Sequence, residues 1–256
     1  MNIPAGTGTL LQQYFDKVFV VSIPRFTERH QKVQQQLEGV AFDFFWGADK
    51  LNLDLQQAKQ NGVYNEEKTI ALQRQGKPLN LGELACSLSH RMVYEEMIKH
   101  NWQKVLILED DIVPLLQNMA ALPGALKELP PDWELVYLGY LKNETVSTGA
   151  RIKQGFYKIL SALGLMKWTY TMVSNSLPSK YSAHLKKAGF HDCTHAYAIT
   201  LSAAKKLLAA QTPVVYRADD LLSHTILKGD INGFVTEPKF FDQEVFHNSN
   251  AVSEIR

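Results

Sequence analysis

The sequence Val105-Leu106-Ile107-Leu108-Glu109-Asp110-Asp111 joins a short apolar run to three consecutive acids. The apolar run predicts a buried strand. Glu109, Asp110 and Asp111 would then lie at its C-terminal edge, which is where ligands bind in α/β sheets. Their mutual repulsion is tolerable when a divalent cation or a network of donors sits among them. The alternative is a strand-ending turn with solvated acids, because acids are common in turns.

Patterns on either side of this run predict an α/β fold. The predicted strands lie at 18–23, 42–46, 133–140 and 196–200, with another near 234–235, and residues 51–78 form a polar excursion. The first predicted helix is capped by Thr27 and has Val33 and Leu37 on its core face. The second, at 80–100, starts at an Asn80/Glu83 capping box and has Leu84, Leu88 and Met92 in its core stripe. A third helix runs from Ser202 to about residue 210. The opening strand-helix-strand order is typical of a Rossmann-type nucleotide-binding half. Neither G-x-G-x-x-G nor a P-loop is present.

Composition limits the class of protein. The 256 residues are 45% hydrophobic, with a net charge of +1 and two cysteines. This length suits one large α/β domain or two small ones, and the two cysteines predict reduced thiols in the cytoplasm. The balanced charge gives no reason to expect a nucleic-acid partner. Residues 1–16 lack the pattern of a signal peptide, Gly6-Thr7-Gly8 predict a flexible terminus, and no run is long and apolar enough to span a bilayer.

Cationic side chains follow the first predicted strand. Arg25 and Arg29 would share the sheet edge with the acids, and Arg suits phosphate or ribose contacts. The alternative is a solvated first helical turn. With Mg²⁺ or Mn²⁺ bridging the carboxylates Asp110 and Asp111 to phosphate oxygens, the edge would bind a nucleotide diphosphate, and Glu109 would hold a ribose hydroxyl or a metal-bound water.

The pair Asp219-Asp220 precedes an apolar run. One of the two acids would suit the base that deprotonates an acceptor hydroxyl. A helix N-cap explains the same pair.

Cysteine and histidine occur in two groups. Cys86 and His90 share one face of the predicted helix, and His191, Cys193 and His195 follow later. A zinc site using one pair from each group is one interpretation. Buried Cys with hydrogen-bonded His is a second, and a ligand contact by His90 or His195 is a third.

Residues 156–170 mix apolar and aromatic side chains with lysines. A packed helix is one interpretation, and a mobile lid or a membrane-surface patch is the other.

Several of these landmarks together resemble glycosyltransferase family 25, which comprises bacterial lipooligosaccharide galactosyltransferases and collagen-modifying relatives. The matching segments are Val20-Val21-Ser22-Ile23 with Arg25 and Arg29, Gly82-Glu83-Leu84-Ala85-Cys86-Ser87-Leu88-Ser89-His90, Leu106-Ile107-Leu108-Glu109-Asp110-Asp111, 132–139, 194–197 with Ala203-Ala204, and Asp220, Pro238 and Gln243. The Ala-Cys-x-x-Ser-His segment followed by the acidic run is the specific part.

The resemblance implies a single GT-A-like domain over residues 1–256 with a mixed, mostly parallel sheet. It implies a metal-dependent, inverting transfer of a hexose from a nucleotide sugar, most often UDP-galactose, to a saccharide or glycolipid acceptor. By position it implies Asp111 as the best metal ligand, followed by Asp110, with Glu109 and Asp110 as donor contacts. It also implies Asp220 as base, with Asp219 as the second candidate. It implies Glu83, Ser89 and His90 in the donor or acceptor pocket. Residues 141–187 match least and would form an acceptor-side lid.

The lipooligosaccharide context suggests a peripheral contact at the cytoplasmic face of the inner membrane, with residues 156–170 as the contact. Two other classes use similar acids. A metal-dependent phosphohydrolase or nucleotidyltransferase would need a further His/Asp set for a second ion. A non-catalytic nucleotide-sugar-binding module would keep the acids for structural reasons.

Overall fold

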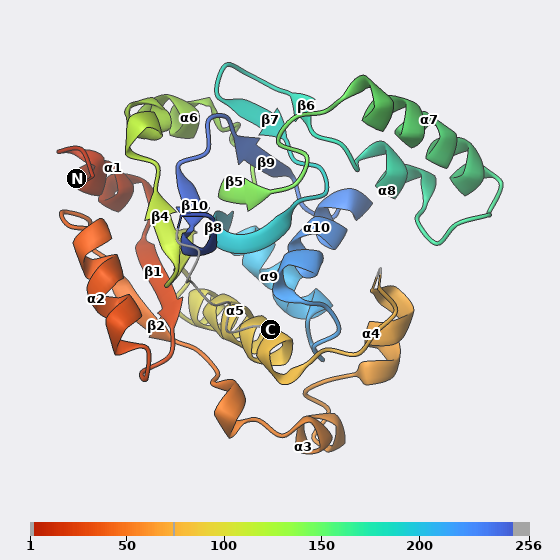
Figure 1. The fold of residues 1–256 in the computed structure, drawn as a ribbon, viewed down its shortest axis with the longest axis horizontal. Coiled ribbons are helices and arrows are strands. Elements are labelled where there is room, and N and C mark those ends of the chain that lie inside the picture. Colours follow the sequence, from red (N-terminus) through yellow and green to blue (C-terminus); the bar gives the residue numbers. More distant parts are fainter. Residues whose placement is uncertain (1–2, 74, 248–256) are drawn as a thin grey trace.

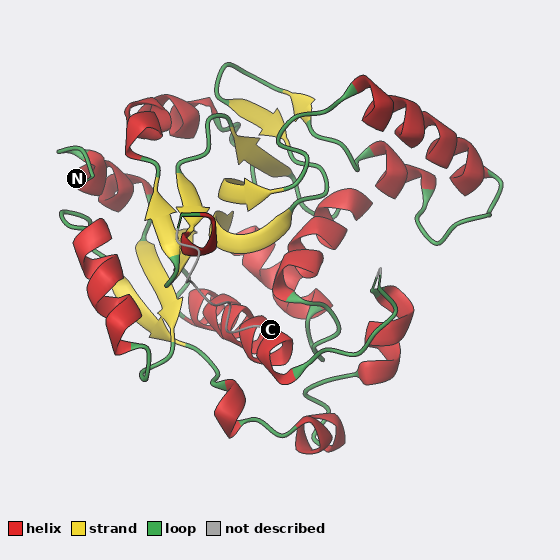
Figure 2. Cartoon of the chain, in the orientation of Figure 1, coloured by secondary structure: helices red, strands yellow, loops and turns green. Residues whose placement is uncertain are grey.

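The fold is a mixed α/β domain built on one large sheet (Figures 1 and 2). The computed structural model describes residues 3–73 and 75–247. The strands are β1 Lys17–Ser22, β2 Asp43–Trp46, β3 Lys104–Glu109, β4 Ile112–Pro114, β5 Leu135–Leu141, β6 Ser179–Lys180, β7 Leu185–Lys187, β8 Asp192–Thr200, β9 Gly233–Thr236 and β10 Phe241–Gln243. The large sheet has the order β2-β1-β3-β8-β5-β9-β7-β6, and β10 pairs with β4 separately.

Six of the eight strands in the large sheet point the same way. β1 is parallel to β2 and β3, and β5 is parallel to β9. β8 runs opposite to β3 and β5, and β7 runs opposite to β9 and β6. The predicted Rossmann-like, mostly parallel sheet is therefore confirmed.

Helices cover both faces of the sheet (Figure 1). The helices are α1 Thr7–Tyr14, α2 Thr27–Gln36, α3 Leu55–Gln60, α4 Glu66–Leu72, α5 Leu81–Lys99, α6 Leu122–Glu128, α7 Thr148–Ala162, α8 Tyr170–Ser174, α9 Leu201–Ala210 and α10 Ala218–Lys228, with 3-10 turns η1 Lys50–Asn52, η2 Leu116–Ala121 and η3 Glu244–Phe246. One core lies between the sheet and α1, α2 and α6, and the other lies between the sheet and α5, α9 and α10.

The central strands are apolar throughout because both of their faces are buried. In β3, Leu106 and Leu108 enter the first core, whereas Val105 and Ile107 enter the second. All four side chains are fully buried. A strand that enters two cores reads as a continuous apolar run rather than an alternating one, and this is why β3 was recognisable from sequence.

The capping box predicted at Asn80 is present. The Asn80 side chain accepts from the Glu83 amide at 2.8 Å, and Glu83 Oε2 accepts from the Asn80 amide at 2.9 Å. These contacts satisfy amides that the first turn of a helix leaves without partners, and they fix where α5 begins.

Four local predictions were wrong. Thr27 opens α2 but makes no capping bond, and α9 is capped by Thr200 instead of Ser202. Met92 of α5 is 37% exposed, because the buried stripe turns toward Val93 and Met97.

The fourth concerns the predicted flexible terminus at Gly6-Thr7-Gly8. The helix α1 starts at Thr7, and Gly8 lies so close to the backbone of Gly39 that a Cβ there would be 1.8 Å from the carbonyl oxygen.

The segment predicted as a lid forms α7, α8, β6 and β7. In Figure 1 α7 and α8 lie away from the centre of the sheet. No residue of α7 is buried, although its inner face packs against α8. The interpretation as a packed helix is therefore confirmed only for that inner face. None of the helices in the described residues is long and apolar enough to cross a membrane.

Candidate functional site

The acidic run ends β3 beside the end of β1. Because these strands are parallel and Val21 pairs with Glu109, their carboxyl ends meet at one edge of the sheet. The predicted residues that line a single cavity at this edge are Arg25, Arg29, Ser89, His90, Glu109, Asp110 and Asp111. The prediction that both arginines lie at the same sheet edge as the acids is therefore confirmed, whereas their contact with a donor stays a prediction.

Both carboxylate oxygens of Asp110 accept from protein donors. Arg29 Nη1 donates to Asp110 Oδ1 at 2.7 Å, and Ser22 Oγ donates to Asp110 Oδ2 at 2.5 Å. Ser22 in turn lies 2.9 Å from His30 Nε2. Asp110, 8% exposed, thus holds Arg29 in the cavity, and each of its oxygens keeps a second lone pair. Its role as a metal ligand beside Asp111 stays a prediction.

Asp111 has the opposite environment. Its Oδ1 is buried without a hydrogen-bond partner, and its Oδ2 accepts only a 3.4 Å contact from Gln243. Burial and the charges of Glu109 and Asp110 raise its pKa to about 7, against an opposing effect of Arg29. An unpartnered buried carboxylate oxygen costs free energy unless a positive charge approaches it. Asp111 therefore fits a divalent cation with oxygen ligands.

The backbone fixes Asp111 in this position. Its carbonyl accepts from the Glu244 amide at 2.7 Å, and the next residue, Ile112, pairs with Gln243 across the β4–β10 ribbon. The ribbon brings the Gln243 side chain over the acids from a segment far away in sequence. Gln243 belongs to the resemblance set, but sequence could not place it here.

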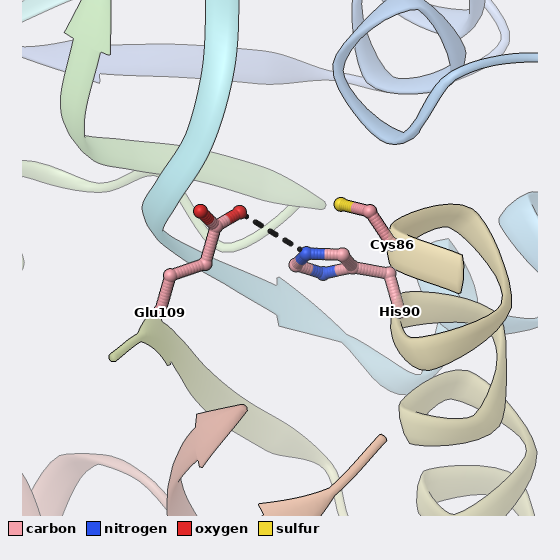
Figure 3. Close-up of side chains that lie close together, drawn as sticks. All are labelled: Cys86, His90 and Glu109. Carbon is pink, nitrogen blue, oxygen red and sulfur yellow. Dashed lines mark hydrogen bonds and ion pairs between the residues drawn. The ribbon is translucent and has the colours of Figure 1, made fainter. Parts of the chain in front are cut away.

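Glu109 belongs to a separate cluster with Cys86 and His90 (Figure 3). His90 Nε2 lies 3.2 Å from Glu109 Oε1, and Thr194 Oγ1 donates to the same oxygen at 2.5 Å. Burial alone would raise the pKa of Glu109, but the contacts with His90 and Thr194 outweigh it and leave that pKa below its usual value. Glu109 is thus an ionised carboxylate with its donors in place.

His90 is oriented from its other side. Its Nδ1 lies 2.8 Å from the Tyr197 hydroxyl, which lies 3.0 Å from the Tyr94 hydroxyl. The ligand atoms of Cys86, His90 and Glu109 lie within 4.8 Å of one another. Burial followed by the charge of Glu109 keeps the pKa of the Cys86 thiol well above its usual value, so the thiol is neutral in the absence of a cation.

Ser89 and Arg25 shape the wall of the cavity opposite the acids. Ser89 Oγ accepts from the Ala48 amide at 2.9 Å and donates to the Ala85 carbonyl at 2.7 Å. Arg25 Nε donates to Asp49 Oδ2 at 2.7 Å. These contacts tie the loop after β2 to α5 and to the loop after β1, so the cavity has a preformed rim.

A second cavity adjoins the first across Glu109. It shares Cys86, Glu109 and Gln243 with the first cavity, and its other lining residues are Glu83, Cys193, Thr194, Arg217, Ala218 and Asp219. Glu83 was predicted without deciding between donor and acceptor. The structure places it in this second cavity, with Arg217 Nη1 3.9 Å away.

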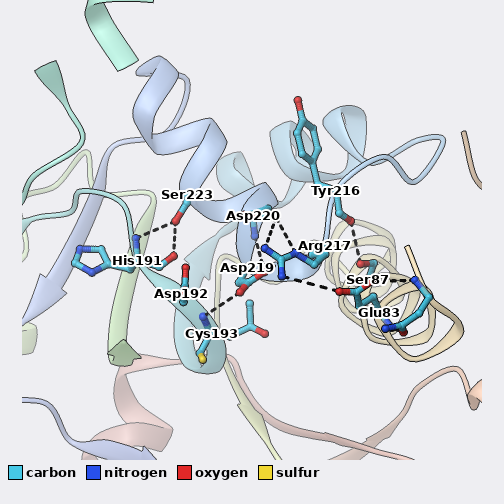
Figure 4. Close-up of polar contacts among 12 residues, drawn as sticks. Glu83, Ser87, His191, Asp192, Cys193, Tyr216, Arg217, Asp219, Asp220 and Ser223 are labelled. Atoms are coloured by element: carbon cyan, nitrogen blue, oxygen red, sulfur yellow. Dashed lines mark hydrogen bonds and ion pairs between the residues drawn. The ribbon is translucent and has the colours of Figure 1, made fainter. Parts of the chain in front are cut away.

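Asp219 and Asp220 lie in the first turn of α10 and point to different places (Figure 4). Asp219 lines the second cavity, where its Oδ2 accepts from the Cys193 amide at 3.3 Å. Burial and then the charge of Asp220 raise the pKa of Asp219. A raised pKa brings a carboxylate closer to the range where it works as a general base.

Asp220 faces away from both cavities. Arg217 donates to its Oδ2 at 2.8 Å through Nε and lies 2.7 Å from it through Nη2. Asp220 instead lines a small cavity with Trp168, Phe190 and Tyr216 among its walls. Of the two adjacent acids, it is Asp219 that lines the second cavity, and which of them acts as the base stays a prediction. Neither acid is the helix N-cap, which is Arg217.

His195 is fully buried between strands rather than in a cavity. Both of its ring nitrogens lack a hydrogen-bond partner, and a Cβ on Gly139 would meet its Nε2 at 2.3 Å. Burial lowers its pKa, against an opposing effect of Glu109. The cavities described above are not lined by His195, so the geometry gives no support for a donor contact.

The zinc site that would join the two Cys/His groups does not form among the described residues. The metal-compatible cluster found there draws on Cys86, His90 and Glu109 alone. His191 uses its ring nitrogens on the Lys142 carbonyl and the Gly189 amide, at 2.9 and 3.1 Å.

Several residues of the site were given no role from sequence, although Ser22 and Thr194 belong to the resemblance segments. Ser22 and Asp49 line the first cavity and Thr194 and Arg217 line the second, whereas His30 contacts Ser22. Ser22 could have been found because it ends β1 on the same edge as the acidic run. The other residues depend on which loop folds over which strand, and no local pattern shows this.

Comparison with known proteins shows a match between residues 15–222 and the family described as "Glycosyltransferase family 25 (LPS biosynthesis protein)". The chain is 27% identical over 198 residues to a "Glycosyltransferase 25 family member" of Anopheles gambiae, covering 76% of this chain and 28% of that protein. It is 24% identical over 248 residues to "Procollagen galactosyltransferase 1" of Danio rerio, covering 88% and 35%.

A third relative is "Inactive glycosyltransferase 25 family member 3" of Homo sapiens. The chain is 27% identical to it over 218 residues, covering 77% of this chain and 29% of the human protein. The chain thus spans about a third of the length of these relatives.

Proposed function

Because this chain belongs to glycosyltransferase family 25, we propose that it transfers galactose from UDP-galactose, with inversion, to a saccharide acceptor of lipooligosaccharide, LPS or another surface glycan. The family description names LPS biosynthesis, and one relative is named a procollagen galactosyltransferase. Donor, acceptor and stereochemistry are parts of this proposal. The cytoplasm is proposed as its site of action, in keeping with the free thiols of Cys86 and Cys193.

The buried, unpartnered Oδ1 of Asp111 carries the proposal. It lies at the cavity edge that Arg29 also lines, so a cation on Asp111 and the guanidinium of Arg29 would both face an anionic diphosphate. Mn²⁺ and Mg²⁺ suit this oxygen ligand equally. When bound, such a cation stabilises the charge of a departing diphosphate as a Lewis acid.

Arg25 and Arg29 supply the remaining positive charge at the donor side. The guanidinium of Arg29 is fixed by Asp110, and that of Arg25 by Asp49. A guanidinium presents its N–H donors in a planar fork, and this geometry suits phosphate or ribose oxygens. Because these side chains are already ordered, less conformational entropy is lost when a ligand binds.

Asp219 is the base in this proposal, and the acceptor occupies the second cavity. That cavity meets the donor cavity at Glu109, so an acceptor hydroxyl there would lie between the donor and Asp219. Deprotonation by Asp219 as the hydroxyl oxygen attacks would give a single displacement, and this accounts for inversion. Glu109, held by His90 and Thr194, stays ionised between the two sides and orients hydroxyl groups.

A two-metal phosphohydrolase is less well supported. Such an enzyme needs a second set of ligands beside the first. In residues 3–73 and 75–247 the cluster that accompanies Asp111 is Cys86, His90 and Glu109, which mixes a thiol with a carboxylate. The named inactivity of the human relative makes a non-catalytic nucleotide-sugar-binding module the second candidate.

Donor binding is tested by thermal stabilisation. UDP-, GDP- and CMP-sugars are each added with Mn²⁺ and, separately, with EDTA. A ligand at 100 times its dissociation constant adds about 2.7 kcal/mol to the free energy of unfolding. We expect stabilisation by a UDP-sugar that EDTA removes. Equal stabilisation with and without EDTA, or none from any donor, would contradict the proposal.

Transfer is tested with the matched variants Asp219→Asn and Asp220→Asn. Both are adjacent acids in one helical turn, and both remove one charge. We expect Asp219→Asn to keep metal-dependent donor binding and to lose transfer by roughly 100-fold or more, the scale of general-base catalysis. Asp220→Asn should retain far more transfer. Comparable transfer by Asp219→Asn and the original protein would show that the base lies elsewhere. Donor binding without transfer in the original protein, across a panel of saccharide acceptors, would favour the binding module.

A further inference from the structure

Apolar side chains are exposed along one face of α7. Ile152, Phe156, Ile159 and Leu163 are 71%, 57%, 60% and 66% exposed. Their spacing of four, three and four residues puts them in one stripe along a helix that advances about 100° per residue. We call these four residues the α7 stripe. A contiguous exposed apolar surface of this kind usually marks a site of interaction.

The stripe is held outward by a well-anchored inner face. Gln154 Nε2 donates to the Val173 and Ser174 carbonyls at 2.8 and 3.1 Å, and Ser161 Oγ donates to the Trp168 carbonyl at 2.7 Å. Polar side chains thus fasten α7 to α8 and to the chain that joins them. The four side chains of the α7 stripe do not belong to any of the hydrophobic cores. Figure 1 shows α7 at the edge of the molecule.

Basic residues flank the stripe on both sides. At about 100° per residue, Arg151 and Lys153 lie on opposite sides of it. Among the residues that the structure describes, neither they nor Lys158 form an ion pair with a carboxylate, and Lys153 and Lys158 lie over the rings of Tyr157 and Tyr170. Long basic side chains beside an apolar face can reach outward while their stems cover apolar surface.

The charge of the whole segment is one-sided. Seven Lys or Arg and no Asp or Glu occur between Glu144 and Asp192. These seven leave 20 of the 27 Lys and Arg for the rest of the chain, against all 26 acids. Three of the seven, Arg151, Lys153 and Lys158, lie on α7 beside the stripe, whereas Lys186 on β7 is paired with Glu237.

We propose that the α7 stripe and its flanking cations dock the protein on a lipid bilayer that contains anionic lipids. An amphipathic helix with cations beside its apolar face inserts that face at the boundary between headgroups and acyl chains. Anionic headgroups complement Arg151, Lys153 and Lys158. A protein partner would have to be both acidic and apolar, whereas an anionic leaflet offers both properties over any area.

Docking is tested by sedimentation with vesicles in the absence of donor and acceptor. One set of vesicles is pure phosphatidylcholine, and the other is an equal mixture of phosphatidylcholine and phosphatidylglycerol. We expect binding to the mixed vesicles, little binding to the neutral ones, and weaker binding in high salt. Binding to neither set, or equal binding to both at all salt concentrations, would overturn the proposal. Because no sugar is present, failure here says nothing about transfer.

Two matched pairs of variants assign the binding to this surface. Ile152→Gln is compared with Leu51→Gln, because both side chains are 71% exposed and only the first lies on the stripe. Lys153→Glu is compared with Lys205→Glu, which has the same net charge but lies on α9. We expect the two α7 variants to bind mixed vesicles roughly tenfold more weakly and the two controls to bind as the original protein does.

A second copy of the chain is the competing occupant of the stripe. Sedimentation velocity over a range of concentrations distinguishes it from a bilayer. A dimer that Ile152→Gln dissociates, together with absent vesicle binding, would overturn the proposal. A thermal midpoint unchanged in all four variants, expected because all four replaced side chains are exposed, shows that lost binding is not lost folding.

Discussion

Replacing Asp111 by asparagine is expected to stabilise the metal-free protein above neutral pH, even though Asp111 is the proposed metal ligand. The pKa of Asp111 is about 7 in the folded chain, against an ordinary value of 3.8. Below 3.8 the carboxyl is protonated in both states and contributes nothing to stability. Between 3.8 and about 7 the unfolded chain releases the proton and the folded chain keeps it. The free energy of unfolding therefore falls as the pH rises through this range.

The size of this cost follows from the two pKa values. At 1.36 kcal/mol per pKa unit, the full difference corresponds to about 4 kcal/mol. Because Asp111 is partly accessible and shares its repulsion with Glu109 and Asp110, we expect a gain of about 2–4 kcal/mol for Asp111→Asn near pH 8. For a chain of this length the thermal midpoint would rise by about 4–8 °C. Near pH 4 the gain should vanish.

Thermal and denaturant unfolding in EDTA across this pH range provides the assay. The matched control is Asp110→Asn, the same substitution at the next residue. Asp110 accepts from Arg29 and Ser22, so its replacement should destabilise the protein by about 1–3 kcal/mol. The adjacent variants are thus expected to have opposite signs. If Asp111→Asn is less stable than the original near pH 8, or its gain does not depend on pH, the reasoning is refuted.

The same variants locate the cation. Mn²⁺ at 100 times its dissociation constant should stabilise the original protein by about 2.7 kcal/mol and leave Asp111→Asn unaffected. Equal stabilisation of both would move the cation to another site, for which Cys86, His90 and Glu109 are the described candidates.

Three further predictions concern packing and local charge. Gly139→Ala should cost about 1–3 kcal/mol, because a Cβ there would meet a buried histidine ring and a backbone carbonyl. Gly155→Ala, in open space on α7, should gain up to about 1 kcal/mol, and denaturant unfolding compares the two. Asn80→Ala should lower the free energy of unfolding by about 1 kcal/mol, because it removes the capping box of α5; no loss would mean that the cap is replaced by water. Glu109, whose pKa lies below the usual value, contributes stability above its unfolded pKa of 4.5 that is lost as the pH falls through the folded value. Thr194→Val should raise the folded pKa of Glu109 and reduce this acid-sensitive part, as titration by NMR and unfolding below about pH 5 would show; an unchanged pKa would discount the Thr194 contact.

The sequence was most informative where one local pattern has one structural outcome. The apolar run before Glu109 predicted a buried strand, which it forms, and the capping box at Asn80 marked the start of α5. The parallel pairing of β1 and β3 then put Arg25, Arg29 and the acids on the same edge. These steps depend on neighbouring residues and on a general rule for α/β sheets.

Predictions from sequence failed where the orientation of a side chain decided the outcome. Asp219 and Asp220 look equivalent in sequence, but successive residues of a helix point about 100° apart. The first faces Cys193 and the second is held by Arg217. His195 lies on β8, and its side chain is buried. It packs against Gly139 of β5, where the backbone of Phe241 in β10 also lies.

The features of this chain therefore have two origins. The sequence by itself determined the central strands, the acidic edge and the charge asymmetry of residues 145–191, because each depends only on consecutive or periodic residues. Only the tertiary structure decided that Asp110 is satisfied while Asp111 keeps an unpartnered oxygen. Donors for these two carboxylates come from Ser22, Arg29 and Gln243, up to 132 residues away, and their distribution depends on how distant segments pack.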